Sequence, residues 1–253
     1  MKRSGVKLLD LPILLLSLAA LLASVLLLRR GGGDEKHVII RTAEAEYVYP
    51  LSKDAVYQIE GSIGISEIEI SGGTVLVYAH DDAINSTGDM LISGGTVVAV
   101  GTNNDAIDAN GNMYLQGGTI IACGANGAEA GIDINEQKKL FITGGNIFAI
   151  GGRVDGNLGS TTQGIITATG SVSANGSVSV SNGSKTLCTF TMPPVSYSNG
   201  NTIIISTPDL SSGSSYTLSS GSSTVSVTAS NTISNTMGGG NNNGGGPNRP
   251  GNW

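Results

Sequence analysis

The first half of the chain contains a repeat, and this repeat constrains the fold more than any other feature. Four segments align around a Gly-Gly step: ISGGTVLVYAHDDAINSTG (70–88), ISGGTVVAVGTNNDAIDANG (92–111), LQGGTIIACGANGAEAGIDINEQ (115–137) and ITGGNIFAIGGR (142–153). The second glycine of each step recurs after 22, 23 and 27 residues, at Gly73, Gly95, Gly118 and Gly145. Each segment holds short alternating runs and none has a helical period. Because such a unit cannot bury its apolar side alone, it must stack on its neighbours.

The spacing therefore predicts an all-β protein built on a short right-handed parallel β-helix over residues 67–160. Equivalent residues of successive coils would lie ~4.8 Å apart and face the interior together. The main predicted interior columns are Ile68, Met90, Met113, Leu140; Ile70, Ile92, Leu115, Ile142; Val75, Val97, Ile120, Ile147; and Ile84, Ile107, Ile132. Small residues finish the inward strand at Val77, Ala99, Ala122 and Ala149.

The outward side of that inward strand is also apolar. Its residues are Leu76, Val98, Ile121 and Phe148, with Tyr78, Val100, Cys123 and Ile150 beside them. An apolar strip of this length is not expected to face water. We expect the rest of the chain to cover it, and the alternative is a surface for a partner or substrate.

An acidic turn follows that strand in three successive repeats. The turns read Asp81-Asp82-Ala83-Ile84-Asn85, Asn104-Asp105-Ala106-Ile107-Asp108 and Glu129-Ala130-Gly131-Ile132-Asp133. In stacked coils the repulsion between these carboxylates costs on the order of a few kcal/mol unless a cation lies between them. Calcium prefers such oxygen ligands. The predicted calcium ligands are Asp81, Asp82, Asn85, Asn104, Asp105, Asp108 and Asp133. The alternative is that these side chains only form the turns.

The composition excludes some classes of function. A formal charge of −6 with only 13 Lys and Arg argues against nucleic acid, because counterion release needs clustered basic residues. Because the chain has only three Phe and one Trp, its core must be mainly aliphatic. Cys123 and Cys188 lack metal-ligand spacing, so they are either one disulfide or two thiols. His37 and His80 are isolated in the sequence, which argues against zinc.

The two ends of the chain differ from the repeat. Residues 1–33 contain an uncharged stretch at 11–28 preceded by Lys2, Arg3 and Lys7, which predicts a cytoplasmic stub and an uncleaved transmembrane helix. Residues 34–66 are predicted to be a β segment that caps the repeat, and 161–236 form a strand-rich C-terminal region that either completes the helix or makes a small sandwich. Residues 237–253 are a Gly/Asn tail predicted to be disordered.

The string GGTV-x-V, followed by DDAIN and a returning GDM-x-ISGG, resembles the bacterial calcium-binding β-helix family usually labelled "carbohydrate-binding domain-containing protein", which is similar in fold to certain pectate lyases. The segment IIISTPDLSSGSSYTLSSGSS (203–223) resembles the closing segment of that family, so the likeness covers roughly 67–223. The third acidic turn departs from the pattern, because its leading Asp is replaced. Residues 45–73 resemble a NusG-domain-II-like module without its cysteine-containing end.

The resemblance implies a function: a membrane-anchored protein at the cell surface that binds acidic (uronate) polysaccharide with the help of calcium. One alternative is a polysaccharide lyase, which needs a base near the cation. The basic side chains in the repeats are Lys138, Lys139, Arg153 and His80. A second alternative is a structural or adhesive surface protein that uses calcium only for folding.

Overall fold

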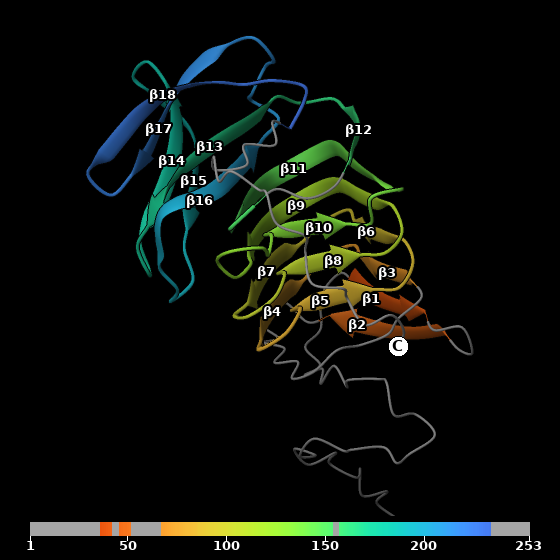
Figure 1. Ribbon diagram of the computed structural model, residues 1–253. Coiled ribbons are helices and arrows are strands. Elements are labelled where there is room, and N and C mark those ends of the chain that lie inside the picture. Colours follow the sequence, from red (N-terminus) through yellow and green to blue (C-terminus); the bar gives the residue numbers. More distant parts are fainter. Residues whose placement is uncertain (1–35, 42–45, 52–66, 154–156, 234–253) are drawn as a thin grey trace, which may run out of the picture.

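The computed structural model describes residues 36–41, 46–51, 67–153 and 157–233. These residues form eighteen β-strands and, within the described ranges, no helix. Residues 68–161 form a β-solenoid of about four turns, and antiparallel strands follow it (Figure 1). No helix among these residues is long and apolar enough to cross a membrane. The predicted transmembrane helix and the Gly/Asn tail lie outside the described residues.

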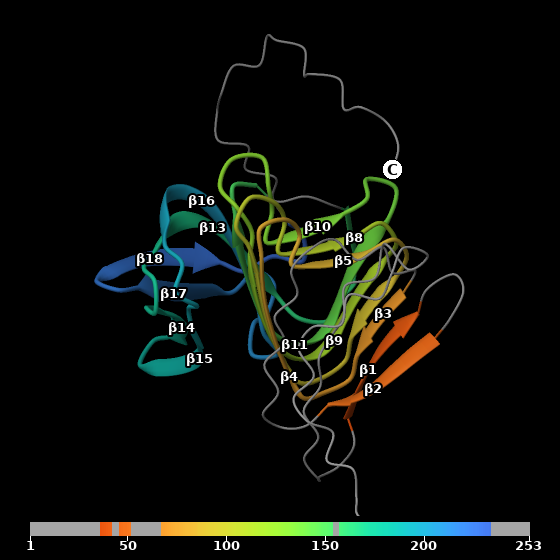
Figure 2. The same cartoon turned by 90° about the horizontal axis from the view of Figure 1, so that it is seen from below.

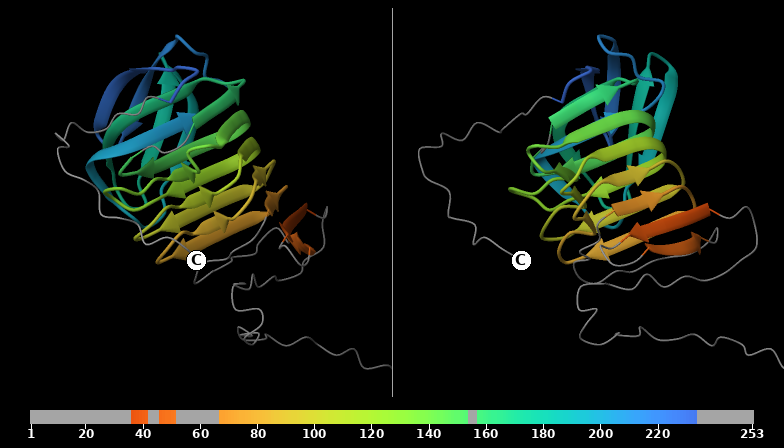
Figure 3. Two further views of the ribbon diagram at one scale, coloured as in Figure 1. Left: turned by 45° about the vertical axis from the view of Figure 1, so that its right-hand side comes forward. Right: turned by 90° about the vertical axis from the view of Figure 1, so that its right-hand side faces the viewer.

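The first three coils of the solenoid each contribute to three faces, and Figure 3 shows the coils stacked along one axis. The first face holds β3 (Glu67–Ile70), β6 (Met90–Ile92), the first halves of β9 (Met113–Cys123) and β11 (Lys139–Gly151), and β12 (Asn157–Thr161). The second face holds β4 (Thr74–Ala79), β7 (Thr96–Gly101) and the second halves of β9 and β11. The third holds β5 (Ile84–Ser86), β8 (Ile107–Ala109) and β10 (Ile132–Ile134). All neighbouring strands within these three groups are parallel.

The repeated Gly-Gly step makes the corner between the first and second faces. Its second glycine has a positive φ in every coil, 76°, 84°, 82° and 87° at Gly73, Gly95, Gly118 and Gly145. The corners also stack closely, because a Cβ on Gly95 would lie 2.6 Å from the carbonyl oxygen of Gly73. Only glycine meets both conditions, so the conformation and the stacking explain the repeat of this step.

The predicted columns of residues fill the interior of the solenoid. One buried cluster contains every residue of those columns, for example Ile92, Leu115 and Ile142 at 0 % exposure. The in-register pairing of Ile68 with Met90, of Met90 with Met113 and of Met113 with Leu140 keeps like residues above one another. The identical register thus produces the aliphatic core that the composition requires.

The C-terminal region continues the second face and also covers its outer side. The strand β16 (Tyr197–Ser206) pairs antiparallel with β11, and β13 (Ile165–Val172) pairs antiparallel with β16. A separate antiparallel sheet has the order β15 (Lys185–Thr191), β14 (Ser177–Asn182), β17 (Ser215–Ser220) and β18 (Ser223–Thr228). In Figure 1 this sheet lies at the upper left, beyond the fourth coil. The C-terminal region thus adds two antiparallel strands to the second face and one separate antiparallel sheet.

The apolar strip on the second face is covered by this chain, as expected. Ile121, Cys123, Phe148 and Ile150 share a buried cluster with residues of the separate sheet, and the rings of Phe148 and Phe190 lie 5.6 Å apart. The cover weakens toward the first coil, where Tyr78 and Val98 are partly buried. Cys123 and Cys188 are both free thiols, which excludes the disulfide alternative.

At the other end, β1 (Lys36–Arg41) forms an antiparallel pair with β2 (Glu46–Leu51) and another with β3. These two strands extend the first face beyond the first coil (Figure 2). The remaining residues of the predicted 34–66 cap lie outside the described residues.

Candidate functional site

The predicted calcium ligands lie together at the corner between the second and third faces. We call Asp81, Asp82, Asn85, Asn104, Asp105, Asp108 and Asp133 the acidic turn stack. Its innermost column consists of Asp82 and Asp105, which are 7 % and 5 % exposed. The amide of Asp105 donates to Oδ1 of Asp82 (3.1 Å), and the amide of Ala130 donates to Oδ1 of Asp105 (2.5 Å). Each carboxylate therefore holds the backbone of the next coil.

A second column of the stack lies on the third face. Asn85, Asp108 and Asp133 are in register on β5, β8 and β10, and all three are half-buried. Nδ2 of Asn85 donates to Oδ2 of Asp82 (2.7 Å) and to Oδ2 of Asp108 (2.9 Å). The amide of Ile134 donates to Oδ1 of Asp133 (2.8 Å). The Asn85 amide thus bridges two carboxylates of adjacent coils.

The outermost members of the stack form another contact between coils. Nδ2 of Asn104 donates to Oδ1 of the exposed Asp81 (2.7 Å). Beside them, the side chains of Asn103 and His80 are hydrogen-bonded, with Nδ2 and Nε2 separated by 2.6 Å. The first and second coils are therefore joined by polar contacts both at the buried Asp82 and at the exposed Asp81.

Burial and mutual repulsion change the acidity of the stack. Burial raises the pKa of Asp105 to about 8, the hydrogen bond from Ala130 opposes this rise, and the charges of Asp133, Asp82 and Glu129 add to it. Burial also raises the pKa of Asp82, against the hydrogen bonds from Asn85 and from the Asp105 amide. Near neutral pH the innermost column therefore holds a proton or needs a compensating cation.

The structure brings the predicted ligands together but uses several of their oxygens for backbone amides. Within the described ranges, no group of three or more His, Cys, Asp or Glu side chains is arranged so that it could hold a metal ion. In the third turn Ala130 stands in the place of Asp82 and Asp105, so this turn adds no carboxylate to the innermost column and only the Ala130 amide joins the ladder. Calcium binding by the stack stays a prediction, and the hydrogen bonds of Asp82, Asn85 and Asp105 show that these residues also have a turn-forming role.

The sequence reasoning missed a second candidate site, on the outward side of the first face. Glu69, Leu91, Tyr114 and Phe141 are in register on successive coils. The rings of Tyr114 and Phe141 are stacked, with centroids 4.9 Å apart and an interplanar angle of 6°. Beyond them, a Cβ on Gly159 would lie 2.6 Å from the Phe141 ring, so a larger residue there would collide with it. We call Leu91, Tyr114 and Phe141 the ridge.

A polar column runs beside the ridge. It contains Glu67, Asp89, Asn112 and Lys139, which directly precede the buried Ile68, Met90, Met113 and Leu140 of their strands. The amide of Asn112 donates to Oδ1 of Asp89 (2.7 Å), and the amide of Lys139 donates to Oδ1 of Asn112 (3.1 Å). These hydrogen bonds fix the side chains of Asp89 and Asn112 relative to the ridge.

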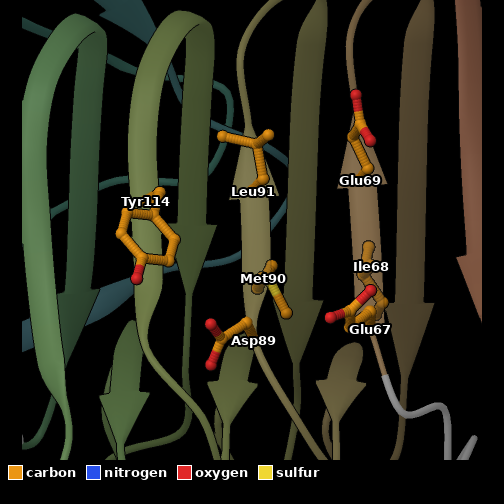
Figure 4. Close-up of a pocket in the computed structure, with 7 residues that line it drawn as sticks. All are labelled: Glu67, Ile68, Glu69, Asp89, Met90, Leu91 and Tyr114. Atoms are coloured by element: carbon orange, nitrogen blue, oxygen red, sulfur yellow. The ribbon is translucent and has the colours of Figure 1, made fainter.

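Between the ridge and the first coil the surface forms a hollow of about 190 Å³. It is lined by Glu67, Ile68, Glu69, Asp89, Met90, Leu91 and Tyr114. Figure 4 shows the carboxylates of Glu67 and Asp89 and the hydroxyl of Tyr114 toward one end, with Glu69 and Leu91 toward the other. The signal for this site was present in the sequence, because aligning the outward positions of the first strand gives the ridge directly.

The fold defines the chain as an all-β protein with a short β-solenoid and a C-terminal antiparallel sheet. No family model matches the sequence, and no curated protein or solved structure matches it. The family resemblance therefore stays a prediction from the motifs.

Proposed function

We propose that this chain is a carbohydrate-binding β-solenoid that holds a polysaccharide on the outward side of its first face. The observation that carries the proposal is the ridge, where two stacked aromatic rings and a leucine continue through three coils. The ridge side chains are half-buried rather than covered. The resemblance of the motifs to a carbohydrate-binding family supports the same class of ligand.

The chemistry of the face suits a sugar chain. The apolar side of a sugar ring packs on an aromatic or aliphatic surface, and its hydroxyls need fixed hydrogen-bonding partners nearby. The polar column supplies carboxylate, amide and ammonium groups along the same line of coils. A site on strands holds these groups more firmly than a site on loops would.

Calcium has a separate place in the proposal, because the acidic turn stack lies at the corner between the second and third faces and the ridge lies on the first face. Asp82, Asp105, Asp108 and Asp133 would supply its carboxylate ligands. Burial is the main cause of the raised pKa of Asp105, and the ion would offset the neighbouring charges that raise it further. Its role would be to hold the coils together. Binding of uronate polysaccharide through calcium stays a prediction, as do the right hand of the coil, the membrane anchor and the location at the cell surface.

Binding assays with the full-length chain test the proposal. The ligands are a neutral glucan, polygalacturonate and a glucosamine polymer, each measured with calcium and with a chelator. Tyr114→Ala removes the aromatic surface, and we expect it to weaken the affinity for whichever polymer binds by about fivefold, because an aromatic contact is worth roughly 1 kcal/mol. The matched control is Asp209→Asn, at an exposed residue of the C-terminal region.

The same assays separate the alternatives. New ultraviolet absorbance from an unsaturated product would indicate a lyase. Absence of binding to all the polymers, with a folded chain by circular dichroism, would leave a structural role. Binding that Tyr114→Ala leaves unchanged would move the site away from the first face.

A further inference from the structure

We propose that the hollow beside Tyr114 binds the protonated amine of an amino sugar, so that the first face selects an aminated polysaccharide. This inference rests on the proposed function and names the class of sugar. It differs from the uronate expectation in the sign of the charge that the ligand carries.

The charge of the hollow is the first argument. Among the described residues, its lining contains no Lys, Arg or His, and it contains the carboxylates of Glu69 and Asp89 beside that of Glu67, which is in register with Arg41 of β1. Glu69 lies on β3, and Asp89 directly precedes the adjacent strand β6 (Figure 4). A uronate carboxylate placed here would meet like charge on both strands, whereas an ammonium group would meet opposite charge. The hollow therefore favours a cation.

The aromatic wall is the second argument. One face of the Tyr114 ring is stacked on Phe141, and Tyr114 also lines the hollow. A cation within about 6 Å of an aromatic centroid is attracted by the negative charge of the ring face. The Tyr114 side chain therefore offers a cation an aromatic surface and a hydroxyl beside the carboxylates.

The third argument is that part of the site is held in place before a ligand arrives. The hydrogen bond from the Asn112 amide fixes Oδ1 of Asp89. The stacking on Phe141 fixes the plane of the Tyr114 ring. Groups that are already ordered lose less conformational freedom on binding, which raises the affinity for a ligand of the matching shape.

The size of the hollow and its continuation along the ridge favour a sugar over a peptide. At about 190 Å³ the hollow is smaller than the sites of about 300–1,000 Å³ that enclose drug-sized ligands, so it takes one ring-sized group. Beyond it the ridge continues to Phe141, which gives the next rings of a sugar chain an apolar surface. A lysine side chain would fill the hollow but would use the ridge less.

The experiment compares two oligosaccharides, one with a protonated amine on each ring and one in which an acetyl group removes that charge. The full-length chain is titrated by calorimetry with a glucosamine hexamer and with its N-acetylated counterpart, at about pH 6, where amines are protonated and carboxylates are ionised. We expect the amine form to bind at least about tenfold tighter, because acetylation removes the charge that pairs with the carboxylates. Asp89→Asn keeps an acceptor for the Asn112 amide, and we expect it to reduce this preference. Asp209→Asn is the matched control and should retain it.

Each outcome has a distinct meaning. Equal binding of the two hexamers, lost in Tyr114→Ala, would overturn the amine inference and keep the carbohydrate proposal. Binding of polylysine in place of both hexamers, sensitive to Tyr114→Ala, would overturn both and assign a basic peptide to the hollow. Preference for polygalacturonate would overturn the inference in favour of the acidic polysaccharide. A preference that Asp89→Asn leaves unchanged in a folded protein would move the amine to another site.

Discussion

At the scale of single residues, Asp105 makes the stability of the folded state depend on pH. Its carboxyl is buried, and it accepts a hydrogen bond from the amide of the next coil. Burial and neighbouring charges raise its pKa to about 8, from the 3.8 of an unperturbed aspartate. The folded state therefore binds a proton more tightly than the unfolded state does, so the proton stabilises the fold.

This shift predicts how stability depends on pH. The contribution of the proton is fully present below about pH 4 and is lost as the pH rises through about 8, because the folded state then loses a proton that the unfolded state lost earlier. The variant Asp105→Asn stays neutral and keeps an acceptor for the Ala130 amide. We expect the melting temperature of the variant, relative to that of the original chain, to increase as the pH rises from about 5 to 9. Circular dichroism measures both melting temperatures. Parallel curves for the two proteins would contradict the shift.

Calcium gives a second prediction at this scale. Above about pH 8, where Asp105 is ionised, calcium should raise the free energy of unfolding by about 1–3 kcal/mol at concentrations well above its dissociation constant. Asp133→Asn removes a proposed ligand on the third face and should reduce this gain, whereas Asp209→Asn should keep it. Chemical denaturation with calcium, magnesium or a chelator measures the effect. A gain of the same size in Asp133→Asn would show that the ion binds elsewhere.

At the scale of elements, the glycine corners decide whether neighbouring coils can stack. Gly95 combines a φ of 84° with an approach that leaves no room for a Cβ. Gly127 has a similar φ of 92°, but nothing lies within 4 Å of the place where its Cβ would be. The two residues thus separate the cost of the backbone conformation from the cost of the collision.

We predict that Gly95→Ala destabilises the protein well beyond Gly127→Ala. The variant at Gly127 should lose about 1–2 kcal/mol, the cost of a left-handed conformation for a residue with a Cβ. Gly95→Ala carries that cost and also pushes the first and second coils apart. Urea unfolding curves of the two variants give the comparison. Equal losses would mean that the corners can move apart without penalty.

The strands also differ in how far their packing can be predicted from the sequence. The interior columns could be predicted because parallel stacking in one register repeats the same spacing, as with Ile92 above Ile70. The strand β16 could not, because it comes from a distant part of the chain and pairs in the opposite direction. The amide ladder through Asp82 and Asp105 depends on distances between coils, which residue types alone do not reveal. The ridge was not predicted, because its residue type changes from coil to coil, from Leu91 to Tyr114 to Phe141.

At the scale of the whole molecule, the solenoid and the separate C-terminal sheet share one buried cluster. Phe148 on the fourth coil and Phe190 on β15 belong to it, and Tyr197 on β16 donates a hydrogen bond to the carbonyl of Gly124 (2.7 Å). Because the second face would otherwise expose its apolar strip, the two parts depend on each other for stability.

We therefore predict that the described parts of the chain unfold in a single transition. Phe190→Ala removes a ring that is 2 % exposed, and it should cost about 3–5 kcal/mol. The loss should appear equally in hydrogen exchange of the solenoid strands and of the C-terminal sheet. The companion variant Val225→Ala changes the one large, highly exposed apolar side chain among the described residues and should change little. Faster exchange confined to β14, β15, β17 and β18 would show that the sheet unfolds independently.

The antiparallel direction of β16 has a consequence for how such a chain can lengthen. On the second face, the edge of the last coil is already paired with a strand that runs the opposite way. A duplicated unit added after the fourth coil would have to displace that strand before it could join the stack in parallel. Gene duplication can therefore extend this protein by inserting a unit between existing coils, while the C-terminal end keeps its length.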